Sequence, residues 1–93
     1  MTVDEKTRVK QSQNVFVREF DGELVVLDLA RGEYFGLDAL GARTWNGLVA
    51  GRTVTQLADE FVSAYDVDLD TLRSDLVSLL RDLVERGLVE VEP

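Results

Sequence analysis

The stretch that decides the fold is residues 15–37, VFVREFDGELVVLDLARGEYFGL. Two runs rich in Val, Leu and Phe, residues 15–20 and 23–29, are separated only by the Asp-Gly pair at 21–22. This dipeptide predicts a two-residue hairpin, because both central positions of such a turn take a positive φ. A longer turn then leads to a short third strand over residues 33–37. The pattern therefore predicts a three-stranded antiparallel meander.

The second and third of these strands differ in their side-chain patterns. Residues 23–29 are apolar on both faces, which is typical of a central strand that is covered on both sides. The third strand is short and carries Glu33 and Gly36, as edge strands often do. We therefore expect residues 33–37 to form an exposed edge of the sheet.

Helical periodicity follows the predicted sheet. The spacing of apolar residues predicts three helices, over residues 39–49, 54–65 and 69–86. Asp38 and Asp68 are suitable N-caps, and Thr53 with Gln56 has the spacing of a capping box. Residues 88–92 alternate and fit a short strand. Three strands followed by three helices indicate an α+β domain whose second and third helices, beside a hairpin, resemble a winged helix-turn-helix.

The N-terminal residues differ from the rest of the chain in composition. Residues 1–13 are almost wholly polar, so we expect a loosely ordered tail there and one folded domain over residues 14–93. The N-terminus lacks the apolar core of a secretory signal, and no run approaches the roughly 20 apolar residues of a membrane span. We therefore expect a cytoplasmic protein that does not bind membranes.

The composition also excludes most catalytic chemistry. The chain has no His and no Cys, so it lacks imidazole and thiolate metal sites, Cys nucleophiles and His-based acid–base groups. Its only lysines, Lys6 and Lys10, lie in the expected tail, and no serine stands in a glycine-flanked nucleophile elbow. We therefore expect a protein that is not an enzyme and that holds no cofactor or metal.

Nucleic-acid binding is disfavoured by charge. The net charge is −8, and the helix predicted over residues 69–86 carries four acidic residues against three arginines. A helix that enters the major groove beside phosphates is normally basic. The winged-helix shape is therefore expected without its usual DNA-binding function.

The exposed edge and the third helix together indicate a peptide site. An edge strand offers unpaired N–H and C=O groups to an incoming extended peptide. Backbone pairing alone is insufficient, because each bond contributes about 0.5–1.5 kcal/mol whereas each ordered residue costs about 1–2 kcal/mol. Apolar anchors are therefore needed, and Val77 and Val84 widen the apolar face of the helix. The alternative is that both valines pack within the core.

Residues 34–45, YFGLDALGARTW, carry a recognisable order of Tyr, Leu, Asp, Gly and Trp. Together with the Thr-Val pair at 53–54, the Tyr-Asp-Val at 65–67 and the Leu-Val-x-x-Gly-Leu at 83–88, this run resembles the PqqD-like family over about residues 14–91. Thr44 departs from the aliphatic residue that many members have there. We expect that departure to affect packing only.

The resemblance implies a RiPP precursor peptide recognition element. Such a domain binds the leader segment of a ribosomally made precursor as an added strand, between the third strand and the third helix, and delivers it to a modifying enzyme. The sequence of residues 34–48 looks more like that of the free-standing recognition subunit of lasso peptide systems, which serves a separate leader peptidase. One alternative is a PqqD-type protein that presents its precursor to a radical SAM enzyme.

Other uses of the same fold also stay open. They are a winged-helix DNA-binding regulator, a structural subunit that pairs its edge strand with an enzyme, and a dimer formed through the exposed edge.

The resemblance also implies a set of peptide-binding residues. The strand side would comprise Glu33, Tyr34, Phe35, Gly36 and Leu37, and the helix side Arg73, Leu76, Val77, Leu80, Arg81 and Val84. Phe35 and Leu37 share one face of the strand and fit the core equally well, whereas Tyr34 lies on the other face. As groove residues, Arg73 and Arg81 would meet acidic side chains of the leader.

Overall fold

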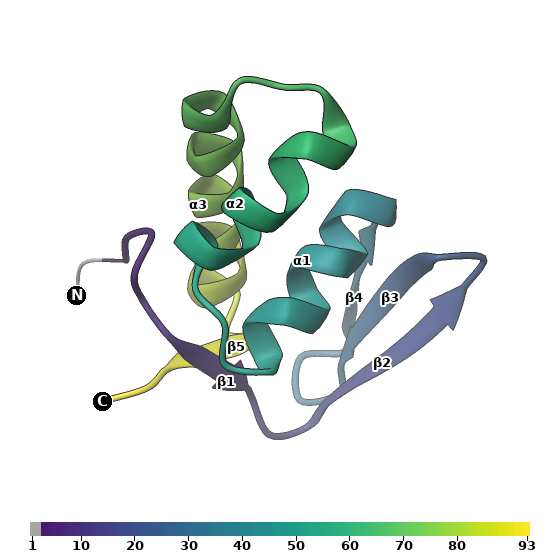
Figure 1. Cartoon of the computed structure of the whole chain (residues 1–93). Coiled ribbons are helices and arrows are strands. Elements are labelled where there is room, and N and C mark those ends of the chain that lie inside the picture. The colour runs from purple at the N-terminus through teal and green to yellow at the C-terminus, as the bar shows by residue number, and fades with distance from the viewer. Residues whose placement is uncertain (1–2) are drawn as a thin grey trace.

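The computed structural model describes residues 3–93, in which three helices lie beside a three-stranded sheet and a two-stranded sheet lies at one end (Figure 1). The strands are β1 (Val9–Gln11), β2 (Val15–Phe20), β3 (Glu23–Asp28), β4 (Glu33–Leu37) and β5 (Val89–Val91). The helices are α1 (Ala39–Val49), α2 (Val54–Tyr65) and α3 (Leu69–Glu85). This confirms the predicted α+β class, and the arrangement is compatible with a winged helix-turn-helix.

The predicted meander is present, with strand order β2-β3-β4. Asp21 and Gly22 both have positive φ angles, 51° and 83°, as the two-residue hairpin between β2 and β3 requires. Both strand pairs are antiparallel, and Val26 of β3 pairs with Val17 on one side and Phe35 on the other. β3 is therefore the central strand, as predicted, and β4 lies at an edge.

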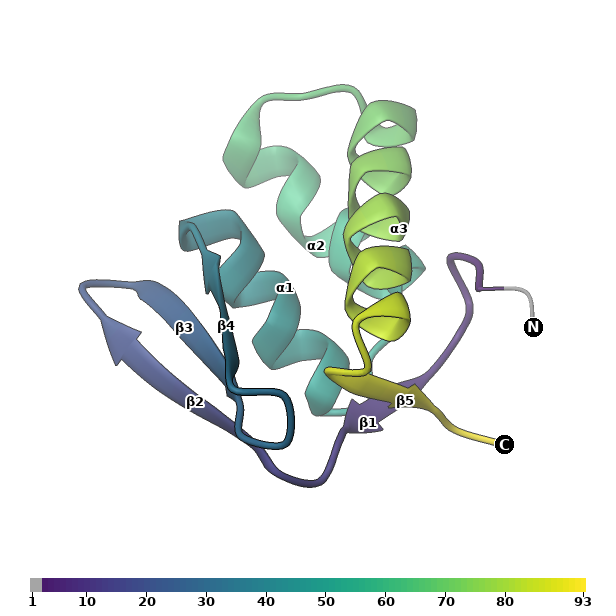
Figure 2. The ribbon, with the colours of Figure 1, turned by 180° about the vertical axis from the view of Figure 1, so that it is seen from behind.

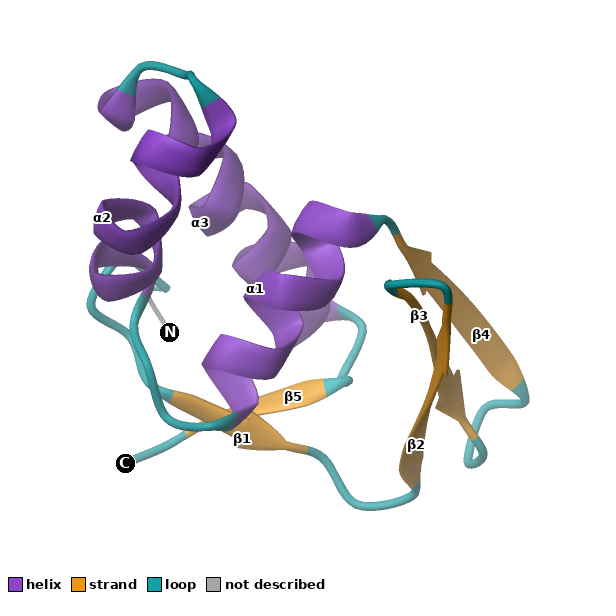
Figure 3. Ribbon diagram, turned by 45° about the vertical axis from the view of Figure 1, so that its right-hand side comes forward, coloured by secondary structure: helices purple, strands orange, loops and turns teal. Residues whose placement is uncertain are grey.

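The prediction that β3 is covered on both faces is wrong. Leu24 and Val26 are buried, but Val25 and Leu27 on the opposite face are only partly buried, and Leu29 is 62% exposed. The reason is that all three helices lie on one side of the sheet (Figure 3). The other side, called here the outer face, is open within the described part of the chain.

Each helix begins where the sequence predicts. The Asp38 carboxylate accepts from the Gly41 N–H, and the Asp68 carboxylate accepts from the Thr71 N–H. At the start of α2, Thr53 and Gln56 form both bonds of the capping box. None of these three helices has the length and apolar character needed to cross a membrane.

The core lies between the sheet and the helices. Its largest fully buried side chains include Trp45, Leu48, Leu57, Leu80 and Leu83. Two glycines of α1 allow close packing: a Cβ at position 41 would lie 3.2 Å from Leu37, and one at position 47 would lie 2.3 Å from Leu57. The motif residues Trp45 and Gly41 therefore serve packing.

The N-terminal segment departs most from expectation. Residues 9–11 form β1, which pairs antiparallel with β5, and Val9 is fully buried. Nearer the N-terminus, Val3 is also buried, and the Thr55 N–H donates to the Glu5 carbonyl at 3.0 Å. The expected loosely ordered tail is therefore wrong for residues 3–13, which pack as part of the domain. The short strand expected near the C-terminus is confirmed as β5.

This packing predicts that Val9→Ala destabilises the whole domain. The substitution removes two buried methyl groups and leaves a cavity, so we expect the free energy of unfolding to fall by about 1.5–3 kcal/mol. Urea unfolding followed by the fluorescence of Trp45 measures the change. Lys10→Ala, at an exposed position of the same strand, is the control and should change it by less than about 0.5 kcal/mol. Equal effects of the two substitutions would show that β1 does not belong to the folded unit.

Candidate functional site

Both outer edges of the three-stranded sheet lack a partner strand. β2 and β4 each pair only with β3, and the backbone hydrogen bonds described over residues 3–93 include no further partner for either strand. Every second residue of each edge strand therefore directs its N–H and C=O away from the sheet. The two edges differ in surroundings, because only β4 lies next to α3 (Figure 2).

The side chains of β4 alternate between two environments. Leu37 is buried and Phe35 is partly buried, and both point toward the helices. Tyr34 points to the outer face and is 79% exposed. The structure thus confirms that Phe35 and Leu37 share a face that Tyr34 does not. An extended peptide beside β4 would have alternate side chains next to Phe35 and next to Tyr34.

A small hollow, called here the β4 hollow, lies between the beginning of β4 and the end of α3. It has a volume of about 40 Å³. Its lining residues are Val26, Asp28, Glu33, Tyr34, Phe35, Arg86 and Leu88. The Arg86 guanidinium lies 4.7 Å from the centroid of the Phe35 ring, and its Nε donates to Asp82 Oδ1 at 3.2 Å. Arg86 therefore covers the apolar floor of the hollow.

The contact between Phe35 and Arg86, the C-cap residue of α3, indicates which side of α3 faces β4. Residues spaced by three and four positions share one side of a helix. The side that carries Arg86, called here the β4-facing stripe, therefore comprises Asp75, Leu79, Asp82 and Arg86. Leu79 is partly buried and Asp75 is exposed. The stripe thus combines one apolar side chain with two carboxylates and one guanidinium.

The predicted helix-side residues lie elsewhere. Arg73, Val77 and Arg81 line a different and larger hollow, of about 570 Å³, with Ser74 and residues 4–6 of the N-terminal segment. Leu76 and Leu80 are buried in the core, and Val84 packs partly buried against it. The structure therefore brings Glu33, Tyr34 and Phe35 together, but not with the α3 residues that the sequence predicted as their partners. The interpretation of Val77 and Val84 as the groove floor is not supported by this geometry.

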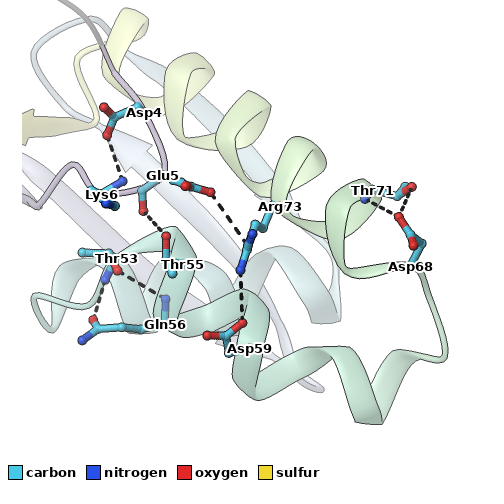
Figure 4. A network of polar contacts seen from close by, with 10 residues as sticks. All are labelled: Asp4, Glu5, Lys6, Thr53, Thr55, Gln56, Asp59, Asp68, Thr71 and Arg73. Atoms are coloured by element: carbon cyan, nitrogen blue, oxygen red, sulfur yellow. Dashed lines mark hydrogen bonds and ion pairs between the residues drawn. The ribbon is translucent and has the colours of Figure 1, made fainter.

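A polar network explains the position of Arg73 (Figure 4). Its guanidinium lies 3.8 Å from Glu5 Oε2 and 3.6 Å from Asp59 Oδ1, so it links the N-terminal segment to α2. The Thr55 hydroxyl also donates to the Glu5 carbonyl at 3.2 Å. The N-terminal segment thus lies against the side of α3 opposite β4. Sequence reasoning missed this because it treated residues 1–13 as a tail.

Four residues of the β4 hollow were not predicted as site residues: Val26, Asp28, Arg86 and Leu88. A signal for Arg86 was present, because Asp82 precedes it by four residues, the spacing of an ion pair on a helix.

Over residues 3–93, no three acidic side chains converge in a way that could hold a metal ion. The hollow therefore offers a backbone edge, an aromatic floor and charged side chains, which are the means of binding an extended chain.

Comparisons with known proteins agree with this geometry. The family model for coenzyme PQQ synthesis protein D (PqqD) matches residues 23–89. Among solved structures, TbiB1 in complex with the TbiA(beta) leader peptide is 40% identical, with a TM-score of 0.80 over 87% of this chain and 94% of that one.

A lasso peptide synthetase B1 complexed with its leader peptide is 25% identical, with a TM-score of 0.83 over 89% of this chain and 98% of that one. No curated protein matches the chain. The family match spans most of the chain, from β3 to the beginning of β5. The chain therefore belongs to the PqqD family and is a PqqD-like RiPP recognition element.

Proposed function

We propose that this protein is a non-catalytic module that binds the leader segment of a ribosomally made precursor as a strand added along β4. The observation that carries the proposal is the unpaired edge of β4 next to Phe35 and α3, in a chain that matches two leader-peptide complexes over most of its length. The module then delivers the precursor, in the cytoplasm, to a separate processing enzyme. Alternate residues of Glu33–Leu37 contribute backbone N–H and C=O groups to the edge, and Tyr34 and Phe35 contribute side-chain contacts.

The energetics require more than backbone pairing. Net backbone hydrogen bonds of about 0.5–1.5 kcal/mol each do not outweigh an ordering cost of about 1–2 kcal/mol for each peptide residue. Phe35 lines the β4 hollow, and Leu79 lies on the β4-facing stripe of α3, so both can offer apolar surface to the peptide. Each apolar side chain buried there contributes about 1.5–3 kcal/mol, so anchors of this kind are needed for net binding.

The enzyme served is proposed to be a lasso leader peptidase. Both solved structures named above are leader complexes, and one is described as a lasso peptide synthetase subunit. The alternative is a PqqD-type role with a radical SAM enzyme, which the family match supports. The genes beside this one distinguish the two: a leader peptidase with an asparagine-synthetase-like cyclase supports the first, and a radical SAM enzyme supports the second.

A test of the binding edge compares two exposed aromatic residues of the outer face. Tyr34 is on β4, whereas Phe20 is on β2 at the opposite edge and is 62% exposed. With the synthetic leader of the neighbouring precursor gene, labelled with fluorescein, Tyr34→Ala should raise Kd at least fivefold because it removes contact surface beside the added strand. Phe20→Ala should change Kd less than twofold. Comparable losses, or no loss in either variant, would contradict binding along β4.

The two sides of α3 give a second test. Leu79 is on the β4-facing stripe, and Val77 lines the hollow on the opposite side. Leu79→Ala should raise the Kd for the same leader about fivefold or more, whereas Val77→Ala should leave it within twofold. Anisotropy titration gives the Kd values, and circular dichroism shows that both variants are folded. If Val77→Ala raised Kd more than Leu79→Ala, the peptide would instead bind on the side of α3 that faces the N-terminal segment.

DNA binding is the competing function from a different class, and it has a direct test. The protein should show no binding to a mixed-sequence 30-base-pair duplex at 20 mM salt, because its net charge is −8. Saturable binding that weakens as salt rises would support the regulator instead.

A structural subunit that pairs β4 with an enzyme, or with a second copy of this chain, is a further alternative. It would form that complex without leader, which analytical ultracentrifugation detects.

A further inference from the structure

Charges are distributed unevenly around α3. The chain has ten basic residues, yet Arg86 is the only one that lines the β4 hollow. The opposite side of α3 has Arg73 and Arg81, which share their hollow with Lys6. The basic side chains of this region are therefore mostly turned away from the edge strand.

The carboxylates lie on the other side of the same helix. Asp75 and Asp82 are on the β4-facing stripe, and Glu33 begins β4. Asp82 forms an ion pair with Arg86, so the charge of the one guanidinium that lines the hollow is already neutralised. Among the ion pairs described over residues 3–93, none involves Glu33 or Asp75. Glu33 thus has an unpaired carboxylate at the β4 hollow, and Asp75 has one on the same side of α3 as Arg86.

Two other acidic groups, one on each side of β4 in the sequence, are engaged within the fold. Asp28 accepts from the Ala30 and Arg31 N–H groups and lies 4.0 Å from the Arg31 guanidinium. Asp38 caps α1. These groups add negative charge to the region but are not free to form a new pair. Glu33 and Asp75 are therefore the groups with charge to offer a peptide.

We propose that the peptide recognised along β4 is cationic in its bound segment, with Lys or Arg at positions that face the β4-facing stripe, and that acidic residues there are rejected. This inference rests on the proposed function and names the peptide class that the same edge selects. It reverses the expectation that Arg73 and Arg81 meet acidic leader side chains, because both arginines line the hollow beside residues 4–6 and neither lines the β4 hollow.

Strand geometry specifies which peptide positions matter. Side chains of the added strand that share the face of Phe35 point toward α3, and the intervening ones share the outer face with Tyr34. Lysine or arginine at the first set can bury its methylene stem against Phe35 and Leu79 while its charged end reaches Asp75 or Glu33. Glutamate at the same positions would meet like charge. The preference is therefore expected at alternate positions only.

The experiment uses the leader encoded beside this gene, labelled with fluorescein, and two variant sets in which successive residues are replaced by Lys or by Glu. Lys should be tolerated or improve binding, and Glu should raise Kd about two- to fivefold, at alternate positions of the bound segment. For the unsubstituted leader, the double variant Glu33→Gln, Asp75→Asn should raise Kd about three- to tenfold. Glu19→Gln with Glu92→Gln, exposed positions on β2 and after β5, makes the same change in net charge and should alter Kd less than twofold.

A charge swap completes the test. Asp75→Lys should restore the binding of a leader that carries Glu at the peptide position facing residue 75. The same variant should weaken the binding of a leader that carries Lys at that position. Tight binding that is insensitive to all these charges would overturn the inference and leave the proposed function standing, as would a preference for Glu. Absence of any leader binding at 20 mM salt by the folded wild-type protein would instead overturn the proposed function.

Discussion

The pairing of β4 with β3 is the contact on which the rest of this structure depends. Its register is set by burial: Val26, which faces Phe35, and Leu37, which faces Leu24, lie on the helix side of the sheet. A slip by one residue would place Tyr34 in the core and expose Leu37, so the register has no close competitor. Because the chain enters α1 at Asp38, directly after β4, no further strand of the described chain covers the edge.

The two sides of α3 acquire different roles from this arrangement. One side faces β4 and carries Leu79, Asp82 and Arg86, and the other is held against the N-terminal segment through Arg73 and Glu5. Residues 4–6 of this segment line a hollow together with Arg73, Val77 and Arg81 on that other side.

Much of the fold was predictable because its signals are local. The Asp-Gly hairpin, the caps at Asp38 and Asp68 and the capping box at Thr53 each need only a few neighbouring residues. β1 was not predictable in this way, because it pairs with β5, whose residues lie at the other end of the chain. The exposed edge of β4 was predicted, but the side of α3 that lies next to it was not. Helical spacing gives the faces of α3 and does not say which neighbour lies against each face.

Amide hydrogen exchange of the protein with and without the leader peptide tests the central claim most directly. If the leader adds as a strand along β4, every second amide of β4 should become protected, since its N–H then donates to the peptide. The outward amides of β2, the other free edge of the same sheet, should exchange at unchanged rates. Protection along β2, or saturable binding that leaves the amides of β4 unprotected, would contradict the account.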